Sequence, residues 1–366
     1  MHLETVQMQR PNETPLAPFS CQYTSHVPEI LLKLGCSLAV TTYQAGKLVL
    51  ISPKDENVLV QLPRTFDKPM GIAQDKEKDK LAIACRDSVV VLTNSPNLAA
   101  FYPPAPQKYD ALYMPRMTYH TGQLDIHDLN FGRDGKLYAV NTLFSCLIAL
   151  DDDYNFTPYW KPWFIDGISS DDRCHLNGMA MQDGLPKYAT AFNQGNTRQS
   201  WRENITKTGV LMDVTTNEVV VDGLAMPHSP RIYNRELYTL LSATGELIKI
   251  DPVKGTYEVI IKLDGFVRGM DLHKDYLFIG LSKLRKNSST FAKLDFADKA
   301  NEAGIVIVHL PTGSIAGKIT YQASLDEIYD VHVLADKLRP NVLNTIKPEY
   351  KMGVSIPGST FWAQNS

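Results

Sequence analysis

Short apolar runs of about five residues, rich in β-branched side chains, alternate with polar turns along most of the chain. In its first part the runs are Ser37 to Tyr43, Lys47 to Ser52 and Val58 to Leu62. The breaks between them, Gln44 to Gly46 and Pro53 to Asn57, have the composition of turns. Helical periodicity is scarce, and only Pro28 to Leu34 predicts a short helix. The pattern therefore predicts an all-β fold.

One feature recurs through the chain: a polar or small residue opens an apolar run, as in Met226-Pro-His-Ser-Pro-Arg231. Aligning these openings gives six equivalent positions, 40 to 61 residues apart: Gly71, Asp128, Gly178, Ser229, Gly269 and Asp330. A four-stranded propeller blade takes roughly 40–50 residues. The spacing therefore predicts a radial repeat, with the excess residues in loops.

The two ends of the repeat complement each other. The opening at Asp330 has no complete blade after it, and the three runs between residues 37 and 62 have no opening strand before them. Pairing strand 329–334 with the N-terminal runs removes two sheet edges and gives a single six-bladed β-propeller over residues 31–338. Residues 1–30 are then an N-terminal extension and residues 339–366 a C-terminal tail. An open two-domain β arrangement is the alternative.

Long insertions are expected on one face, where the innermost strands begin. They cover residues 93–126, 151–175, 193–208 and 283–303, and the first three contain tyrosine or tryptophan. Such loops form the walls of a pocket or its lid. Packing between blades is the other role open to each of these aromatic side chains.

The residue before each aligned position should point into the central funnel. These residues are Met70, His127, Asn177, His228, Arg268 and Tyr329. The ends of the second strands add further polar groups on the same face, at Tyr43, Gln44, Arg86, Asn141, Asn193, Ser242 and Lys283. Five of the six axial residues can make polar contacts, where a barrel built only for packing would have small or apolar side chains.

Three kinds of chemistry fit these residues. His127, His175 and His228 could bind a divalent metal, since imidazole nitrogen suits zinc, iron or copper. Alternatively, His127 or His228 is a general base, with Tyr329 or the other histidine as the acid. Finally, Arg268, Arg86 and Arg231 could bind a carboxylate or a phosphate, for which a guanidinium is well shaped. Asn177, Lys283, Asn141 and Tyr43 complete the expected substrate contacts.

A purely structural role is the alternative for the same ring of side chains. Polar groups on the axis of a propeller can hydrogen-bond ordered water and stiffen the channel. No Walker loop, G-x-G-x-x-G, G-x-S-x-G or H-E-x-x-H motif is present to single out one reaction.

Composition and charge limit the expected partners and cellular location of the protein. The 366 residues are 44% hydrophobic and 21% charged, with a net charge of −3, so no nucleic-acid or membrane partner is expected. No apolar run approaches the roughly 20 residues of a membrane span, and the first 20 residues have no signal-peptide pattern. Five cysteines without a C-x-x-C pair favour reduced thiols and a cytoplasmic location.

Several motifs carry a resemblance to known proteins. Pro227-His-Ser-Pro-Arg231, Gly265-Phe-Val-Arg-Gly-Met-Asp271 and Gly280-Leu-Ser-Lys-Leu-Arg285 resemble those of a bacterial family of conserved hypothetical proteins, found in cyanobacteria and proteobacteria. The resemblance covers about residues 20 to 340 and implies one intact propeller-like domain without an assigned reaction. In architecture the chain is also similar to lactonase and strictosidine synthase-like propellers. Of the lactonase metal ligands, only Asn177 has a candidate equivalent.

We therefore expect an enzyme with a funnel pocket on one face of the propeller. Its substrate would be a small anionic molecule, a peptide or a natural-product intermediate, and its chemistry that of an acid–base lyase, isomerase or hydrolase, with a divalent metal as an open option. The competing hypothesis is a non-catalytic propeller that binds a peptide or protein. It requires an apolar patch of Tyr102, Tyr109, Tyr113, Trp160 and Trp163.

Overall fold

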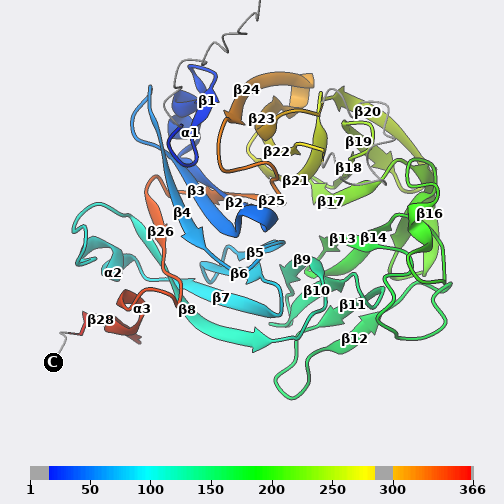
Figure 1. The fold of residues 1–366 in the computed structure, drawn as a ribbon, viewed down its shortest axis with the longest axis horizontal. Coiled ribbons are helices and arrows are strands. Elements are labelled where there is room, and N and C mark those ends of the chain that lie inside the picture. Colours follow the sequence, from blue (N-terminus) through cyan, green and yellow to red (C-terminus); the bar gives the residue numbers. More distant parts are fainter. Residues whose placement is uncertain (1–15, 285–299, 364–366) are drawn as a thin grey trace, which may run out of the picture.

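Six antiparallel sheets stand in a ring around a central axis in the computed structural model, which describes residues 16–284 and 300–363 (Figure 1). Each sheet has four blade strands that run in order from the axis to the rim, and two of the sheets have a fifth strand at the rim. The protein is therefore a six-bladed β-propeller, as the spacing of the strand openings predicts.

From the inner to the outer strand, blade 1 is β25 (Asp330–Ala335), β2 (Cys36–Thr41), β3 (Lys47–Pro53) and β4 (Leu59–Thr65). In the same order, blade 2 is β5 (Ile72–Asp75), β6 (Lys80–Ala84), β7 (Ser88–Asn94) and β8 (Ala111–His120). Blade 3 is β9 (Ile126–Phe131), β10 (Leu137–Asn141), β11 (Cys146–Ala149) and β12 (Thr157–Trp160). Blade 4 is β13 (Leu176–Gln182), β14 (Leu185–Ala191), β15 (Gly209–Asp213) and β16 (Glu218–Leu224). Blade 5 is β17 (Pro227–Tyr233), β18 (Glu236–Leu241), β19 (Glu246–Asp251) and β20 (Thr256–Lys262). Blade 6 is β21 (Phe266–His273), β22 (Tyr276–Ser282), β23 (Ala303–His309) and β24 (Ser314–Tyr321).

Helices are few and short. They are α1 (Val27–Leu34), α2 (Pro96–Ala100) and α3 (Glu349–Met352), with 3₁₀ turns η1 (Tyr43–Ala45), η2 (Ser200–Arg202) and η3 (Leu310–Thr312). The helix predicted from Pro28 is α1; it has proline in its first turn and ends at Gly35, whose left-handed φ of 68° lets its N–H bond the carbonyls of Leu31 and Leu32. No helix in the described residues is long and apolar enough to cross a membrane.

Ring closure occurs in blade 1. There β25 pairs antiparallel with β2, so that Asp330 lies opposite Thr41 and Ala335 opposite Cys36. This pairing confirms the predicted closure by the C-terminal inner strand, and the ring it completes excludes the open two-domain alternative.

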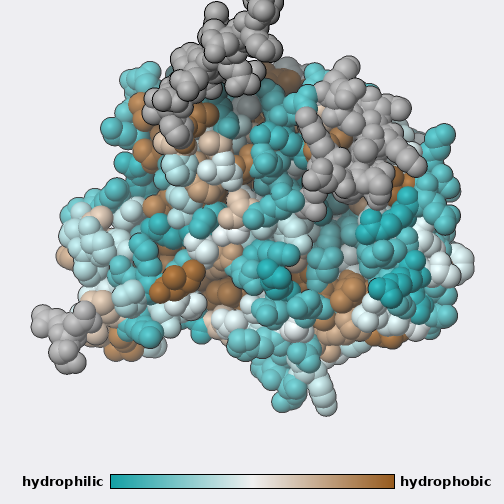
Figure 2. All heavy atoms as spheres, in the orientation of Figure 1, coloured by the Kyte–Doolittle hydropathy of each residue, from teal (hydrophilic) through white to brown (hydrophobic). Residues whose placement is uncertain are grey.

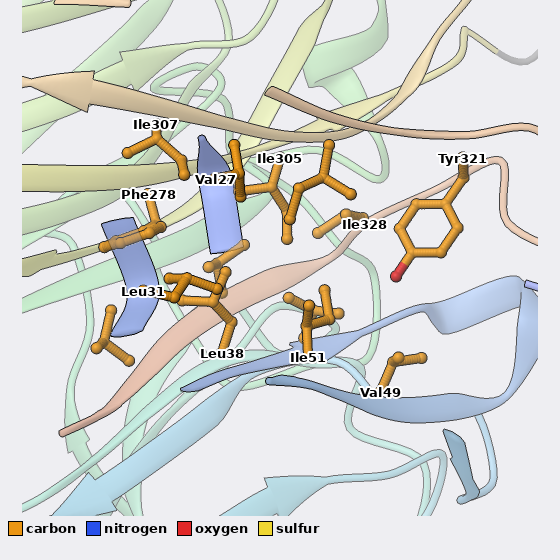
Figure 3. Close-up of a cluster of buried hydrophobic side chains, with 14 of the residues drawn as sticks. Val27, Leu31, Leu38, Val49, Ile51, Phe278, Ile305, Ile307, Tyr321 and Ile328 are labelled. Carbon is orange, nitrogen blue, oxygen red and sulfur yellow. The ribbon is translucent and has the colours of Figure 1, made fainter. Parts of the chain in front are cut away.

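An apolar cluster fills the seam between blades 6 and 1 (Figure 3). Val27 and Leu31 of α1 pack there with side chains from both blades, including Leu38, Phe278 and Ile305. All five are fully buried. Because burying an aliphatic or aromatic side chain stabilises a fold by about 1.5–3 kcal/mol, this cluster supports the closure that the β25–β2 hydrogen bonds begin.

Segments outside the predicted boundaries of 31–338 also join the blades. The strand β1 (Cys21–Tyr23) pairs with β24 of blade 6, and β26 (Pro340–Val342) runs parallel to β8 of blade 2. Beyond it lies a small hairpin of β27 (Gly353–Ile356) and β28 (Ser359–Trp362), next to α2 at the lower left of Figure 1.

The interpretation of residues 93–126 as a loop insertion at the pocket is wrong for most of this segment. Ala111 to His120 form β8, the outer strand of blade 2, and Tyr113 is fully buried. Tyr102 and Tyr109 pack against Trp362 of the C-terminal hairpin. These tyrosines are positioned by a segment that lies some 250 residues later in the chain. Local composition therefore could not predict the contact.

Polar residues and glycines alternate at the six aligned positions around the axis. Each polar side chain accepts a backbone N–H from the inner strand of the next blade: Asp330 from Ile72, Asp128 from Met179 and Ser229 from Gly269, each at 3.0 Å. At the glycines the next inner strand approaches closely, and a Cβ added to Gly269, where φ is 71°, would lie 2.5 Å from Asp330 Cα. Adjacent inner strands are thus joined alternately by a side-chain hydrogen bond and by backbone contact.

A buried ion pair reinforces this arrangement. The two carboxylate oxygens of Asp128 accept hydrogen bonds from the Arg231 guanidinium at 2.7 and 3.2 Å, and both side chains are largely buried. This bidentate ion pair links blade 3 to blade 5, which lie on either side of blade 4. Arg231 is therefore a structural residue of the axis.

Replacing Asp128 with alanine is expected to lower the free energy of unfolding by about 3–5 kcal/mol, because it leaves a buried guanidinium without its partner. Urea denaturation followed by circular dichroism measures the change. Lys254→Ala, which removes an exposed ion pair with Asp251, is the control. It should change the free energy of unfolding far less, because an exposed ion pair contributes little, and an equally small loss in Asp128→Ala would contradict the structural role.

Candidate functional site

A pocket of about 430 Å³ opens where the inner strands begin, at the end of the funnel that the sequence pattern predicts. Its size lies in the range of small-molecule sites. Residues from every blade line it: Tyr43, Met70, Asp125, His127, Leu143, Asp172, His175, Phe192, Gln199, Trp201, Arg202, Met226, His228, Phe266, Arg268, Ser282, Lys283, Leu284, Glu327 and Tyr329.

Most of the site residues expected from the sequence lie in this lining. They are His127, His228, Tyr329, Arg268, Lys283, Tyr43 and His175. Four others do not line the pocket: Asn177, Arg86, Asn141 and Arg231.

These four side chains have interaction partners outside the pocket, and the partners differ from one side chain to the next. Arg86 is half-exposed and paired with Asp67. Asn141 is buried, and its carbonyl oxygen accepts the Phe144 N–H, as in a turn. Arg231 holds Asp128, and the Asn177 carbonyl oxygen accepts a hydrogen bond from Thr190. A polar residue at the end of a strand can cap that strand instead of facing the funnel, and the sequence pattern does not distinguish the two.

His228 presents a hydrogen-bond acceptor. Ser242 Oγ lies 2.6 Å from the Val267 carbonyl and 2.7 Å from His228 Nδ1. Since the carbonyl can only accept, it takes the single hydroxyl proton, and His228 Nδ1 must donate to Ser242. Nε2 is then the unprotonated nitrogen; it is buried and has no hydrogen-bond partner among the described residues. Burial, helped by the charge of Arg268, lowers the pKa of His228 and favours the neutral ring.

His127 has the same tautomer for a similar reason. Its Nδ1 lies 2.9 Å from the Asp125 carbonyl oxygen and donates to it. Burial lowers its pKa to about 4; His175 and Arg268 add to this shift, and Asp125 opposes it. At neutral pH the ring is therefore uncharged, with an unprotonated Nε2. Both axial histidines are acceptors, held neutral mainly by burial.

His175 differs, because its Nδ1 donates to a carboxylate. The Asp172 oxygens lie 3.0 and 3.1 Å from Nδ1, and Trp201 Nε1 donates to the same carboxylate at 2.9 Å. The imidazole packs against the rings of Trp201 and Phe192, with centroids 4.3 and 4.6 Å away, and these two rings also contact each other. This arrangement fixes the ring plane and leaves Nε2 as the second nitrogen of a carboxylate-supported histidine.

Tyr329 and Arg268 form the opposite wall. The guanidinium carbon of Arg268 lies 3.8 Å from the centre of the Tyr329 ring, and its Nη1 is 3.4 Å from Glu327 Oε1. Burial raises the pKa of Tyr329, which keeps its hydroxyl protonated. That hydroxyl is buried and makes no hydrogen bond to the described residues. It is therefore a donor that a ligand can use.

A smaller cavity lies at the axis and shares His127, His228, Arg268 and Tyr329 with the pocket. Its volume of about 10 Å³ is that of roughly one water molecule. Asn177 lines it, and its Nδ2 makes no hydrogen bond to the described residues. Asn177 therefore belongs to the axis beneath the pocket and not to the pocket wall.

The metal hypothesis finds no support in the geometry. Among residues 16–284 and 300–363, no three His, Cys, Asp or Glu side chains are arranged to hold a metal ion. Of the three histidines expected as ligands, His127 and His175 have their ring centroids 4.9 Å apart, whereas His228 contacts Phe192 and Phe266. The donors thus do not converge as a metal site requires.

Sequence reasoning missed several lining residues, Asp172, Phe192 and Glu327, and placed Trp201 only in an insertion expected to wall the pocket. Trp201 and Asp172 lie in insertions that the sequence places on the correct face, but neither has a fixed position in the blade repeat. Glu327 precedes Tyr329 by two residues, so its nearness to the axial ring was the available signal.

The five aromatic residues required for a protein-binding patch do not come together. Tyr102 and Tyr113 are buried in blade 2 and its surroundings, whereas Trp163 is 61% exposed. On the face seen in Figure 2, the hydrophobic residues form small groups separated by polar ones. All five cysteines, in turn, are free thiols.

Comparisons with known proteins agree with the fold. Residues 25–343 match a family model described as Domain of unknown function (DUF4915). The crystal structure of a nidogen/laminin complex is similar, with a TM-score of 0.54 and 10% identity over 82% of this chain and 99% of that one. A protein of unknown function from Bacteroides caccae gives a TM-score of 0.52 and 10% identity over 82% and 98% of the two chains. At this identity the likenesses show the fold alone, and no curated protein matches the chain in sequence.

His127 and His228 are expected to be neutral at pH 7 with the proton on Nδ1, and His127 to titrate near pH 4. In the unfolded chain a histidine takes up its proton near pH 6.5. Between these two values the unfolded state binds more protons, so the free energy of unfolding should fall as the pH is lowered through this window. Histidine ¹⁵N NMR gives the tautomers, and urea denaturation at pH 7 and 4.5 gives the stabilities.

His127→Gln should reduce this fall, since it removes one of the groups that titrate differently in the two states. The control is His309→Gln, which replaces a partly exposed histidine that is bonded to Thr312 and lies outside the pocket lining. Titration of His127 near pH 6.5 would contradict the buried, neutral ring.

Proposed function

This chain belongs to the DUF4915 family, and we propose that its funnel pocket is an active site for acid–base chemistry on a small molecule bearing a carboxylate. One observation carries the proposal: a buried acceptor, His228 Nε2, and a buried donor, Tyr329 Oη, line one pocket without partners among the described residues. Unpaired buried polar atoms destabilise a fold, so their presence together favours a role toward a ligand.

The two groups have complementary protonation states. Burial keeps the His228 ring neutral and the Tyr329 hydroxyl protonated, as their pKa shifts indicate. A proton acceptor and a proton donor in one pocket are what a lyase, an isomerase or a hydrolase needs to move a proton off one atom of a substrate and onto another. We assign His228 as the proton acceptor, with Ser242 holding its ring, and Tyr329 as the proton donor.

Arg268 connects this chemistry to an anionic substrate. Its charge is the largest cause, after burial, of the lowered pKa of His228, and it also lowers that of His127. A carboxylate bound to the guanidinium would offset that charge and raise the pKa of both histidines toward neutrality. Binding of an anion would thereby make His228 a better base, and a molecule without a carboxylate would leave it a weak one.

His127 and His175 support the same site from blades 3 and 4. The His127 ring packs edge-to-face against both His175 and Tyr329. We assign His127 as a second hydrogen-bond acceptor toward the substrate. His175, held by Asp172 and Trp201, fixes the position of His127, because the two rings are in direct contact.

Turnover of a carboxylate by the purified protein tests the proposal. A mixture of small carboxylate metabolites is incubated with the protein and followed by mass spectrometry, and we expect at least one compound to be consumed. His228→Gln and Tyr329→Phe should each slow its consumption by about 10²–10⁴-fold, the usual contribution of acid–base catalysis. The variant His309→Gln, which lies outside the pocket lining, should react at the wild-type rate.

Thermal denaturation of each variant separates chemistry from folding. A variant that melts like the wild type but does not react supports the assignment. Consumption of no compound, or equal rates in the wild type and His228→Gln, would overturn the proposed function.

A further inference from the structure

Three residues that line the small cavity at the axis each have a buried polar atom without a partner. They are Asn177, His228 and Tyr329, and their side chains are almost completely buried. Asn177 Nδ2, His228 Nε2 and Tyr329 Oη make no hydrogen bond to the described residues. Because an unpaired buried polar atom destabilises a fold, three of them around one cavity indicate that the cavity binds a ligand.

The surroundings of these three atoms fix their hydrogen-bonding roles. Asn177 Oδ1 accepts from Thr190 Oγ1 at 2.7 Å, which leaves the amide nitrogen to donate. Tyr329 Oη also donates, because burial raises its pKa and keeps it protonated. His228 Nε2 accepts, since its Nδ1 has the proton and gives it to Ser242. The ligand of the cavity must therefore accept two hydrogen bonds and donate one.

One water molecule meets this requirement. The cavity volume of about 10 Å³ is that of roughly one water, and a buried water typically makes about three hydrogen bonds. An anion such as chloride would be repelled by the lone pair of His228 Nε2. A cation would be repelled by the donors of Asn177 and Tyr329. The mixture of donors and acceptor thus selects a neutral molecule that can do both.

The cavity borders the larger pocket. His127, His228, Arg268 and Tyr329 line both. A general base takes a proton that lies within hydrogen-bond reach, and the proton offered to His228 Nε2 at this border is that of the water. This position favours hydrolysis over removal of a proton from a substrate carbon, which a lyase or an isomerase would need.

We propose that the axial cavity binds one water molecule and that this water is the nucleophile of a hydrolase, an inference that rests on the proposed function. The substrate is an ester or amide that also has a carboxylate for Arg268. The water oxygen forms a bond to the carbonyl carbon while His228 Nε2 takes the proton that the oxygen loses. The bond from this carbon to the leaving group then breaks, and the leaving atom takes the proton of Tyr329 Oη. A proton passes from His228 to the Tyr329 phenolate through the next water to enter the cavity, which restores both groups.

Turnover in H₂¹⁸O tests the role of the water. The carboxylate mixture of the turnover assay, including compounds with ester and amide bonds, is incubated with the wild-type protein, and the products are followed by mass spectrometry. The acid product should contain one ¹⁸O atom and the leaving group none. Consumption of a compound without ¹⁸O in its product would overturn the nucleophilic water and leave the proposed acid–base function standing.

A high-resolution crystal structure of the wild-type protein tests the cavity without any substrate. We expect one water within hydrogen-bond distance of Asn177 Nδ2, His228 Nε2 and Tyr329 Oη. A dry cavity, or an ion in it, would overturn the inference whatever the turnover assay shows.

Asn177 is the positioning residue of this site, and its replacement changes which nucleophile fits. In Asn177→Ala the water loses one of its three hydrogen bonds, so hydrolysis should slow by roughly 10-fold, and the space of the amide group admits methanol. In buffer that contains methanol the wild type should form only the acid, whereas Asn177→Ala should also form the methyl ester. The ratio of ester to acid does not depend on how much of the variant is folded.

Asn141→Ala is the matched control. Asn141 is also buried, and its Nδ2 also has no partner among the described residues, but it lines neither the cavity nor the pocket. This variant should form only the acid. The same ratio of ester to acid in the wild type and in Asn177→Ala would overturn the placement of the nucleophile in the cavity.

Failure of the proposed function has a different result. If no compound is consumed although crystals show the water, the proposed function fails, and the nucleophilic role of the water fails with it.

Discussion

The contact between neighbouring inner strands is the constraint on which the rest of this propeller depends. Three polar side chains, Asp128, Ser229 and Asp330, accept backbone N–H groups from the next blade. Glycines occupy the three positions between them and allow the next strand to approach. Because these contacts form a closed ring, the position of every inner strand is set by its two neighbours, and the axial side chains have little freedom.

That rigidity explains the electrostatics of the pocket above. Burial keeps the pKa of His127 and His228 low: the Asp125 carboxylate, 3.8 Å from His127 Nδ1, does not outweigh it. The axial carboxylates are committed elsewhere, since Asp128 holds Arg231 and Asp330 lies beside His332. Burial alone would lower the pKa of His332, but Asp330 and Asp271 outweigh it and raise this pKa. One end of the axis therefore has charged pairs, such as Asp330 with His332, and the other end has the neutral acceptors His127 and His228. The same residue type behaves differently within one funnel.

The sequence predicts the fold well, because the fold follows from periodicity, and the same periodicity groups the axial side chains that line one pocket. Equivalent strand openings are enough to group His127, His228, Arg268 and Tyr329, and the pairing of strand 329–334 with the first blade is confirmed. Residues outside the repeat are harder to place. Trp201 and Asp172 act through contacts between separate loops, and the surroundings of Tyr102 depend on the C-terminal hairpin. Such partners are set by tertiary packing, which no local pattern encodes.

The pairing of β25 with β2 has a consequence for how the protein is made. His332 lies opposite Ala39, so one strand of blade 1 is synthesised almost 300 residues before its partner. Until β25 leaves the ribosome, the inner edge of β2 has no neighbour, and the seam filled by Leu38 and Phe278 is open. An unpaired apolar edge is a site of aggregation. Biogenesis of this protein thus includes a long interval in which the nascent chain needs protection, and the contact that ends it forms nearly last.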